Sequence, residues 1–249
     1  ASRGAEALWL TVDLPKDFAP GKYSITVRGA AINIYSGDRT DCEKTIELEV
    51  LGVNLPEQSI LFTQWFHTDC IASAHNVDVY SDEHWALIEK YMEAASYLGI
   101  NTILTPVITP PLDTAPGTER PNVQLVRIEK NGDSYTFDFA LLKKWIDLCR
   151  KYNINHFEIS HLFSQWGLEY SPNIYAYING KQEKIFGWHI KSTDESYKSF
   201  LTQFVPALVS FLKSEGVADS CVFHLSDEPS ETHLDAYKYA YELVVPMLE

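Results

Sequence analysis

From residue 59 onward, the chain alternates between short apolar runs and longer amphipathic segments. Apolar runs of this length are typical of buried strands, and the amphipathic segments have the spacing of helices. Strands are expected at residues 60–66, 100–105, 156–160 and 220–225. Strand and helix in regular alternation predict an α/β fold built on a parallel sheet.

Start and stop signals mark the helices between these strands. A polar residue that can cap the first turn precedes each of the first three, and glycine ends the first and third. The signals are Ser81 and Gly99 for the first helix, Asp138 for the second, Ser192 with Glu195 (a capping box) and Gly216 for the third, and Pro229 and Pro246 for the fourth.

The links between these elements are of very unequal length. Helix-to-strand links are minimal, whereas the strand-to-helix links at residues 67–80, 106–137 and 161–193 are long. Long loops at the carboxyl ends of parallel strands form the active face of a (β/α)8 barrel. We therefore expect a TIM-like (β/α)8 barrel of which about four βα units are present, with a hairpin around Asn131-Gly132 in the second loop.

A doubly wound sheet is the competing fold. Such sheets normally have shorter loops and a glycine-rich phosphate turn. Neither G-x-G-x-x-G nor a P-loop occurs in this chain, so the sequence does not support nucleotide chemistry.

Residues 1–55 have a different pattern, with apolar alternation at residues 9–14, 23–27 and 45–50 and a turn signal at residues 17–21. Three or four strands make a poor sandwich alone. We therefore expect residues 1–55 to be the C-terminal portion of a β-sandwich domain and residues 56–249 to be the N-terminal half of the barrel. On this interpretation the chain is an excerpt of a longer protein.

Composition narrows the possible partners. The formal net charge of −14 repels phosphate backbones, so we expect no nucleic-acid partner. No stretch approaches the roughly 20 apolar residues of a membrane span. None of the four cysteines belongs to a Cys-x-x-Cys pair, which argues against zinc-ribbon and thioredoxin folds. Cys149 and Cys221 are expected to be buried.

Polar and aromatic residues follow every expected strand. Because the carboxyl ends of parallel strands share one rim, these side chains should converge on a common site. The set comprises Trp65, His67 and Asp69 after the first strand, Thr109, Pro110, Pro111 and Asp113 after the second, His161, Gln165, Trp166 and Tyr170 after the third, and His224, Asp227 and Glu228 after the fourth.

Asp227 and Glu228 are the most informative pair in this set. Adjacent side chains on a strand point to opposite faces, so both acids reach one pocket only if the strand has ended. Pro229 favours that ending, because it removes a backbone donor and restricts Glu228. The alternative is a solvated helix start, in which Ser226 or Asp227 caps the helix and the acids favour its dipole.

The histidines allow a second hypothesis, a zinc site formed by His67, His161 and His224 with Asp69. No metal-binding pattern such as H-E-x-x-H occurs. We therefore expect no metal and no cofactor, and interpret each histidine alone as a hydrogen-bonded residue of the barrel mouth. Trp166 could stack on a sugar or fill space beneath a loop.

Four ordered motifs resemble glycoside hydrolase family 123, which includes the β-N-acetylgalactosaminidases. The N-terminal segment at residues 9–23 resembles the β-sandwich that precedes the barrel in those proteins. The motifs are Gln64-Trp65-Phe66-His67-Thr68-Asp69-Cys70, Leu104-Thr105-Pro106 with Thr109-Pro110-Pro111-Leu112-Asp113-Thr114, His161-Leu162-Phe163-Ser164-Gln165-Trp166-Gly167, and His224-Leu225-Ser226-Asp227-Glu228-Pro229.

The resemblance implies a retaining hydrolase that removes terminal β-linked N-acetylgalactosamine with help from the sugar's own acetamido group. Asp227 would orient that group and Glu228 would act as acid and base. The expected substrate-binding residues are His67, Asp69, Asp113, His161, Trp166 and His224. The substrate would be a glycan or glycolipid, and family habit favours a periplasmic or secreted bacterial protein. Another β-N-acetylhexosaminidase and an inactive carbohydrate-binding relative remain alternatives.

Overall fold

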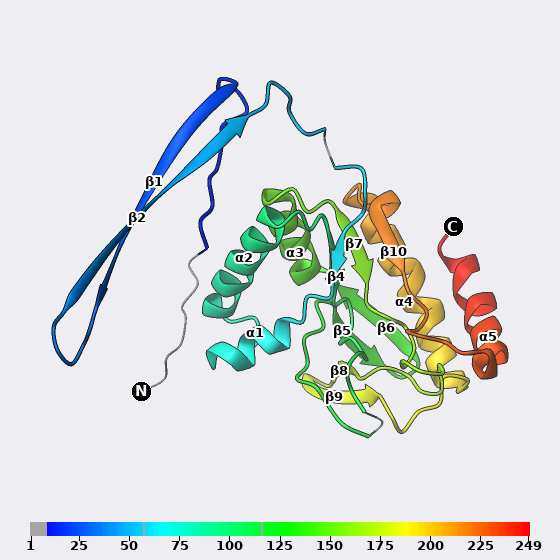
Figure 1. Ribbon diagram of the computed structural model, residues 1–249. Coiled ribbons are helices and arrows are strands. Elements are labelled where there is room, and N and C mark those ends of the chain that lie inside the picture. Colours follow the sequence, from blue (N-terminus) through cyan, green and yellow to red (C-terminus); the bar gives the residue numbers. More distant parts are fainter. Residues whose placement is uncertain (1–8, 57, 116) are drawn as a thin grey trace. The chain divides into compact units, whose positions relative to one another are not determined.

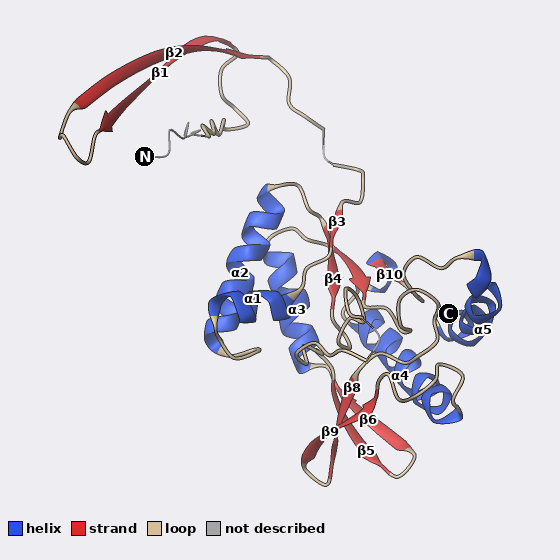
Figure 2. Ribbon diagram, turned by 60° about the horizontal axis from the view of Figure 1, so that its bottom comes forward, coloured by secondary structure: helices blue, strands red, loops and turns tan. Residues whose placement is uncertain are grey.

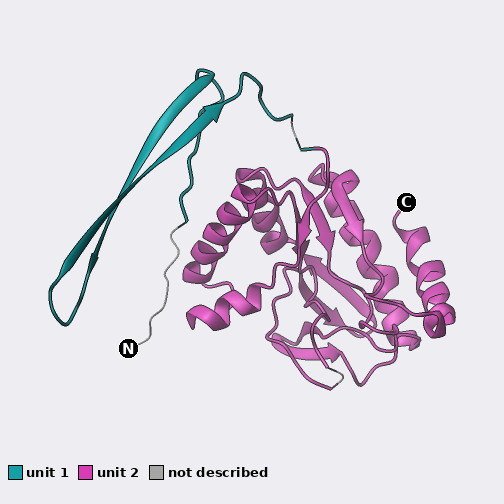
Figure 3. Cartoon of the chain, in the orientation of Figure 1, with its two compact units in different colours: residues 1–58 teal, residues 59–249 magenta. Residues whose placement is uncertain are grey.

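The computed structural model describes residues 9–56, 58–115 and 117–249. Its chain forms two compact units, Ala1–Gln58 and Ser59–Glu249 (Figure 3). Among the described residues, the first unit contains a single hairpin, and the second contains the alternating helices and strands.

The hairpin of the first unit consists of β1 (Gly21–Ile32) and β2 (Arg39–Val50) in antiparallel register. Tyr23 and Ile25 lie opposite Leu48 and Ile46, so apolar side chains share one face. The strand expected at residues 9–14 is wrong, because this segment is irregular and exposed. Alternation yields a strand only where a neighbouring strand supplies the hydrogen bonds of a ladder.

The second unit is organised around a four-stranded parallel sheet. Its strands are β3 (Thr63–Gln64), β4 (Thr102–Thr105), β7 (His156–Ile159) and β10 (Cys221–Phe223). Their spatial order β3-β4-β7-β10 is also their order along the chain. A doubly wound sheet reverses its order at a switch point, and these four strands do not. The sheet is open, with β3 and β10 at its edges.

The three expected helices at the centre of this unit are confirmed as α2 (Asp82–Tyr97), α3 (Ala140–Lys151) and α4 (Glu195–Ser214). The fourth is α5 (Leu234–Val244), between the 3-10 turns Glu231–His233 and Val245–Met247. A short helix, α1 (Thr68–His75), lies where only a loop was expected. Figure 1 shows α2 and α3 beside β4, and α4 beside β10.

The caps of these helices agree with the sequence in part. Ser81 caps α2 by accepting a hydrogen bond from the backbone of His84. Asp138 accepts from the backbone of Ala140 at the start of α3. The capping box at Ser192 is wrong, because Asp194 caps α4 through the backbone of Ser196. Like Ser192, Asp194 has a short side chain with an oxygen that accepts hydrogen bonds, and it lies two residues later, directly before the helix begins.

A second sheet has the order β6-β5-β8-β9, and Figure 2 shows its strands together. The hairpin expected at Asn131-Gly132 is confirmed as β5 (Arg127–Asn131) and β6 (Ser134–Asp138). A further hairpin, β8 (Ile174–Ile178) and β9 (Lys181–Phe186), lies in the third long loop. Both hairpins therefore extend loops that leave the carboxyl ends of the parallel strands.

The two faces of the parallel sheet differ in character. Phe66 packs edge-on against Trp145 of α3 and against Tyr91 of α2, so its side of the chain faces the helices. Because side chains alternate along an extended chain, Trp65 belongs to the opposite face. Cys149, on α3, is fully buried as expected, whereas Cys221 is only half-buried. The face away from the helices therefore carries Trp65, one of the candidate site residues.

Candidate active site

Asp227 and Glu228 lie in the loop that follows β10, and that loop is tied along its length to the loop after β7. The backbone N–H groups of Phe163 and Trp166 donate to the carbonyls of Leu225 and Asp227, at 3.1 Å each. The hydroxyl of Ser226 adds a bond of 2.9 Å to the carbonyl of Ser164. The acid pair is thus held by backbone geometry although β10 has already ended.

The backbone turns sharply at Glu228, where φ is 45°. A non-glycine residue in the left-handed region stores strain, and such residues cluster at functional sites. The sequence indicates that the strand ends before this pair and that Pro229 restricts Glu228, and β10 does end at Phe223. The clash with proline disfavours the right-handed helical region for Glu228, and the residue adopts the left-handed region instead.

Trp166 is an aromatic neighbour of the acid pair. It also has a left-handed backbone, with φ 58°, and its indole N–H lies 3.3 Å from Oε2 of Glu228. Half of its surface is exposed. An exposed indole beside an exposed carboxylate provides an apolar face and a hydrogen-bonding edge in the same place.

The charge environment of Asp227 favours its protonated form. Burial raises the pKa of Asp227 above its usual value, and the negative charges of Glu228 and Asp113 raise it further. The positive charge of His224 and the backbone N–H of Glu228 act in the opposite direction. Asp227 therefore interacts electrostatically with both acidic neighbours and with His224.

Asp113 joins the second long loop to this region. Its backbone is left-handed, with φ 52°, and its N–H donates to the side chain of Gln165 at 2.7 Å. Nε2 of His67 donates to its Oδ2 at 3.2 Å. Burial and the charge of Arg120 lower the pKa of His67, although Asp69 and Asp113 oppose them. His67 is therefore a mostly neutral donor to an exposed carboxylate.

Asp69 lies in a buried ion pair rather than in the open site. Arg120 donates from Nε and Nη2 to its two carboxylate oxygens, at 2.9 Å each, and from Nη1 to the carbonyl of Leu112. Both side chains are nearly inaccessible to solvent. This bidentate pair joins α1 to the second long loop, so its first role is to hold two loops together. Contact of Asp69 with a substrate stays a prediction.

His161 and His224 lie against each other, with stacked rings whose centroids are 4.7 Å apart. Trp65 meets His161 edge-on at 6.0 Å. Burial and the positive charge of His224 lower the pKa of His161 to about 4, so its ring is neutral near pH 7. The first, third and fourth strands therefore contribute to one aromatic cluster.

Glu158 is the residue of this cluster that sequence analysis missed. It lies on β7 with 3% of its surface exposed. Its carboxylate accepts hydrogen bonds from Thr63 at 2.6 Å, Trp65 at 3.0 Å and His224 at 3.0 Å. Burial alone would raise its pKa, but these bonds outweigh burial and lower the pKa to about 2. The signal was present, since a charged residue between Phe157 and Ile159 in a buried strand requires partners.

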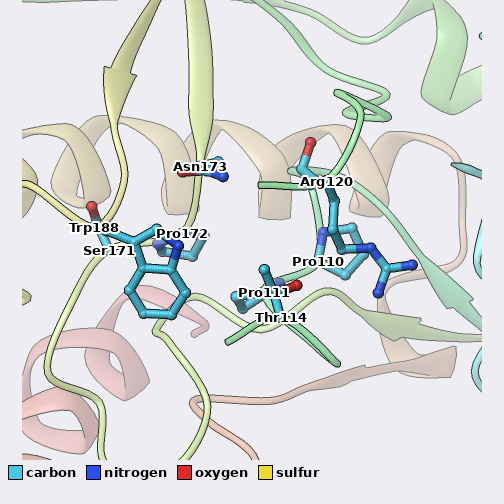
Figure 4. Close-up of a pocket in the computed structure, with 9 residues that line it drawn as sticks. Pro110, Pro111, Thr114, Arg120, Ser171, Pro172, Asn173 and Trp188 are labelled. Carbon is cyan, nitrogen blue, oxygen red and sulfur yellow. The ribbon is translucent and has the colours of Figure 1, made fainter. Parts of the chain in front are cut away.

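A small cavity beside the second and third loops is not the sugar site. It encloses about 10 Å³ of free space, which is no more than one water needs. Trp188 contributes to its wall and donates to the carbonyl of Thr118. Its lining consists of Thr109, Pro110, Pro111, Thr114, Arg120, Ser171, Pro172, Asn173 and Trp188 (Figure 4).

Within residues 9–56, 58–115 and 117–249, no group of three or more His, Cys, Asp and Glu side chains lies close enough to hold a metal ion. Over the same ranges, no helix has the length and apolar character needed to cross a membrane.

Comparison with known families decides the class of this site. The model described as "Glycoside hydrolase 123, catalytic domain" matches residues 65–249. The chain belongs to glycoside hydrolase family 123. Family membership supports glycoside hydrolase activity and a glycan substrate, and the matched region contains every residue of the site described above except Thr63. No curated protein matches this chain.

Changing Asp69 to Asn tests the buried ion pair of this family 123 domain. Breaking a buried pair leaves one charge without its partner, so we expect a loss of about 3 kcal/mol in the free energy of unfolding. Urea denaturation measures this loss. Asp147→Asn, in the exposed Lys143–Asp147 pair, is the matched control and should have a much smaller effect. Unchanged stability with weakened sugar binding would instead make Asp69 a substrate ligand.

The lowered pKa values of His161 and Glu158 predict how stability depends on pH. His161 is neutral in the folded protein down to about pH 4, so stability falls as pH drops from 6.5, where the unfolded residue protonates. Glu158 stays charged down to about pH 2, so its stabilisation is present above about pH 4.5 and is lost below it. Each step amounts to roughly 3 kcal/mol.

Urea denaturation of the full chain between pH 7.5 and 2.5 measures both steps. In His161→Gln the step between pH 6.5 and 4 should shrink relative to the unchanged protein, while the lower step remains. Parallel pH curves for the two proteins would contradict the assignment to His161.

Proposed function

We propose that this family 123 domain is a retaining glycoside hydrolase that removes terminal β-linked N-acetylgalactosamine by substrate-assisted catalysis. The observation that carries the proposal is the adjacent pair Asp227 and Glu228 after β10, with the indole of Trp166 bonded to Glu228. A glycan or glycolipid end is the proposed substrate.

Adjacency of the two acids suits this mechanism. Ordinary retaining enzymes need a nucleophile about 5–5.5 Å across the sugar from the acid. Here the oxygen of the 2-acetamido group attacks the anomeric carbon of its own sugar. Asp227 accepts the acetamido N–H and stabilises the positive charge that develops on the oxazolinium ring. Glu228 protonates the leaving oxygen and then takes a proton from the incoming water.

The surroundings of each acid support these roles. Asp227 must be ionised to stabilise positive charge, so its raised pKa sets an acid limit on this role, and the positive charge of His224 opposes part of that rise. Trp166 offers an exposed indole face next to Glu228, where a sugar ring could stack. Asp113, in contact with His67, adds an exposed acceptor for sugar hydroxyls.

The proposal extends to the fold. Sequential order of β3, β4, β7 and β10 is what consecutive strands of a (β/α)8 barrel have, and long loops leave their carboxyl ends. We take the parallel sheet as part of such a barrel. The one-sided apolar face of the β1–β2 hairpin is likewise compatible with part of a β-sandwich.

Incubation of the full chain with aryl β-N-acetylgalactosaminide and aryl β-N-acetylglucosaminide tests the proposal. Turnover of the first sugar supports it, and turnover of the second alone supports another hexosaminidase. Saturable sugar binding without turnover would identify a carbohydrate-binding relative and overturn the proposed activity.

Substitution of the acid pair separates the two roles. Asp227→Asn and Glu228→Gln should each reduce kcat by about 100- to 10,000-fold. Glu228→Gln should lose less activity on aryl glycosides with acidic leaving groups, because these leave without protonation, whereas Asp227→Asn should lose activity on all substrates. Steady-state kinetics over a leaving-group series measures the difference.

Glu231→Gln and Asp235→Asn are matched controls for that experiment, since both are acids at the start of the following helical segment. They should keep full activity. If all four variants behaved alike, Asp227 and Glu228 would be part of a solvated helix start.

Asp113→Asn tests the electrostatic link to Asp227. Because the pKa of Asp227 is raised, activity that needs its charged form should fall at a higher pH than for an ordinary aspartate. Removing the negative charge of Asp113 lowers that pKa, so the acid limb of kcat/KM should move to lower pH. Asp133→Asn, at a hairpin turn, serves as the control and should leave the limb in place. A shift to higher pH would contradict the charge assignment.

A further inference from the structure

Glu158 links three of the four parallel strands through its side chain. It lies on β7, Thr63 lies on β3 with Trp65 directly after it, and His224 directly follows β10. Its Oε1 accepts from both Trp65 and His224, and its Oε2 accepts from Thr63. All three donors therefore converge on one buried carboxylate.

A carboxylate suits this position better than any neutral side chain. Burying a charge is costly unless hydrogen bonds replace its hydration. An ionised carboxylate only accepts hydrogen bonds, and here it faces three groups that donate. The indole N–H of Trp65 cannot act as an acceptor, so its orientation is fixed by where the carboxylate lies.

The two rings held by Glu158 are part of a larger wall. We call Trp65, His67, His161 and His224 the aromatic wall, since Trp65 contacts both His67 and His161 edge-on and His161 stacks on His224. The ring of His161 contacts both rings that Glu158 anchors. One carboxylate thus sets the orientation of most of the wall.

The wall is also connected to the acid pair. Only Leu225 and Ser226 separate His224 from Asp227. The carbonyl of His224 accepts from the backbone of Leu162, at 3.4 Å, so its ring and its backbone are both fixed. The positive charge of His224 also acts on Asp227. Movement of the His224 ring would therefore displace the start of the loop that carries the acids.

We infer that Glu158 is a positioning residue for the hydrolase: through its bonds to Trp65 and His224 it orients the aromatic wall and the loop that carries Asp227 and Glu228. This inference rests on the proposed function of that pair. Glu158 lies beneath the wall and acts through these neighbours rather than on the sugar itself.

Two substitutions of Glu158 separate positioning from a purely structural role. In Glu158→Gln the amide oxygen can replace Oε1 and keep both bonds, while its NH2 donates to the hydroxyl of Thr63. In Glu158→Met both bonds are lost and the donors Thr63, Trp65 and His224 are left without this acceptor, so we also expect a lower free energy of unfolding. The kinetics of the two variants are therefore compared under conditions in which both are folded, so that a difference in kcat reports orientation.

We expect Glu158→Met to lose about 10- to 100-fold in kcat, with KM changed far less, because misplaced reacting groups slow the chemical step. Glu158→Gln should recover most of that loss. Thr63→Val removes the donor at Oε2 alone and should keep kcat. Glu215→Gln, a half-buried carboxylate paired with Lys143, is the control for an acid far from the wall.

Selective ¹⁵N labelling of histidine and tryptophan gives a readout that needs no turnover. In the unchanged protein, Nε2–H of His224 and Nε1–H of Trp65 should be protected from solvent exchange and shifted by a charged acceptor. In Glu158→Gln both N–H signals should lose the shift, because the acceptor is neutral, but should stay protected. In Glu158→Met they should also lose their protection from exchange, because the acceptor is absent. If Glu158→Met does not fold, the unchanged protein and Glu158→Gln still decide the outcome.

The two readouts distinguish this inference from the proposed function. Protected signals in a protein that turns over neither sugar would overturn the hydrolase activity while leaving the contacts of Glu158 intact. An active protein in which folded Glu158→Met keeps its kcat, or in which the two signals are unprotected, would overturn the positioning role.

Discussion

The parallel sheet depends on one buried charge. Its edge strands β3 and β10 have only two and three residues, so few backbone hydrogen bonds hold them to β4 and β7. Glu158 adds side-chain bonds from a central strand to residues at both edges. Hydrogen bonds to a charged group are stronger than neutral ones, and a buried carboxylate that lost them would pay a large desolvation cost. The charge therefore fixes the strand ends from which the active-site loops leave.

Polar contacts fix the loops that leave those strand ends against one another. Arg120 joins the second loop to α1, Gln165 joins the third loop to Asp113, and backbone bonds join the third loop to the acid pair. Three residues in this chain of contacts, Asp113, Trp166 and Glu228, have left-handed backbones. Such strain persists only where surrounding contacts over-determine the conformation. The site is thus a set of loops that constrain one another, rather than a rigid element with side chains attached.

Much of this could be predicted from sequence where the signal is local. Helix caps such as Ser81 and the hairpin at Asn131-Gly132 depend on neighbours in the chain, and both are confirmed. The hairpin at Asn179-Gly180 has the same turn signal and could have been found in the same way. The strand at residues 9–14 failed because a strand needs a partner that local alternation does not reveal. Of the candidate residues, His161 and His224 do come together, but the bond that holds His224 comes from Glu158, more than sixty positions away in sequence.

The pKa values of Glu158 and Asp227 are shifted in opposite directions, and their surroundings explain why. Glu158 is more deeply buried than Asp227, yet its pKa is lowered, because three donors are directed at it. Asp227 is less buried, but its carboxylate faces two other acids, and its pKa is raised. Where the surroundings separate the pKa values of two acids, the two acids serve different roles. Glu158 keeps its charge across the pH range in which Asp227 titrates. The group that orients the aromatic wall therefore stays ionised while Asp227 changes its protonation state.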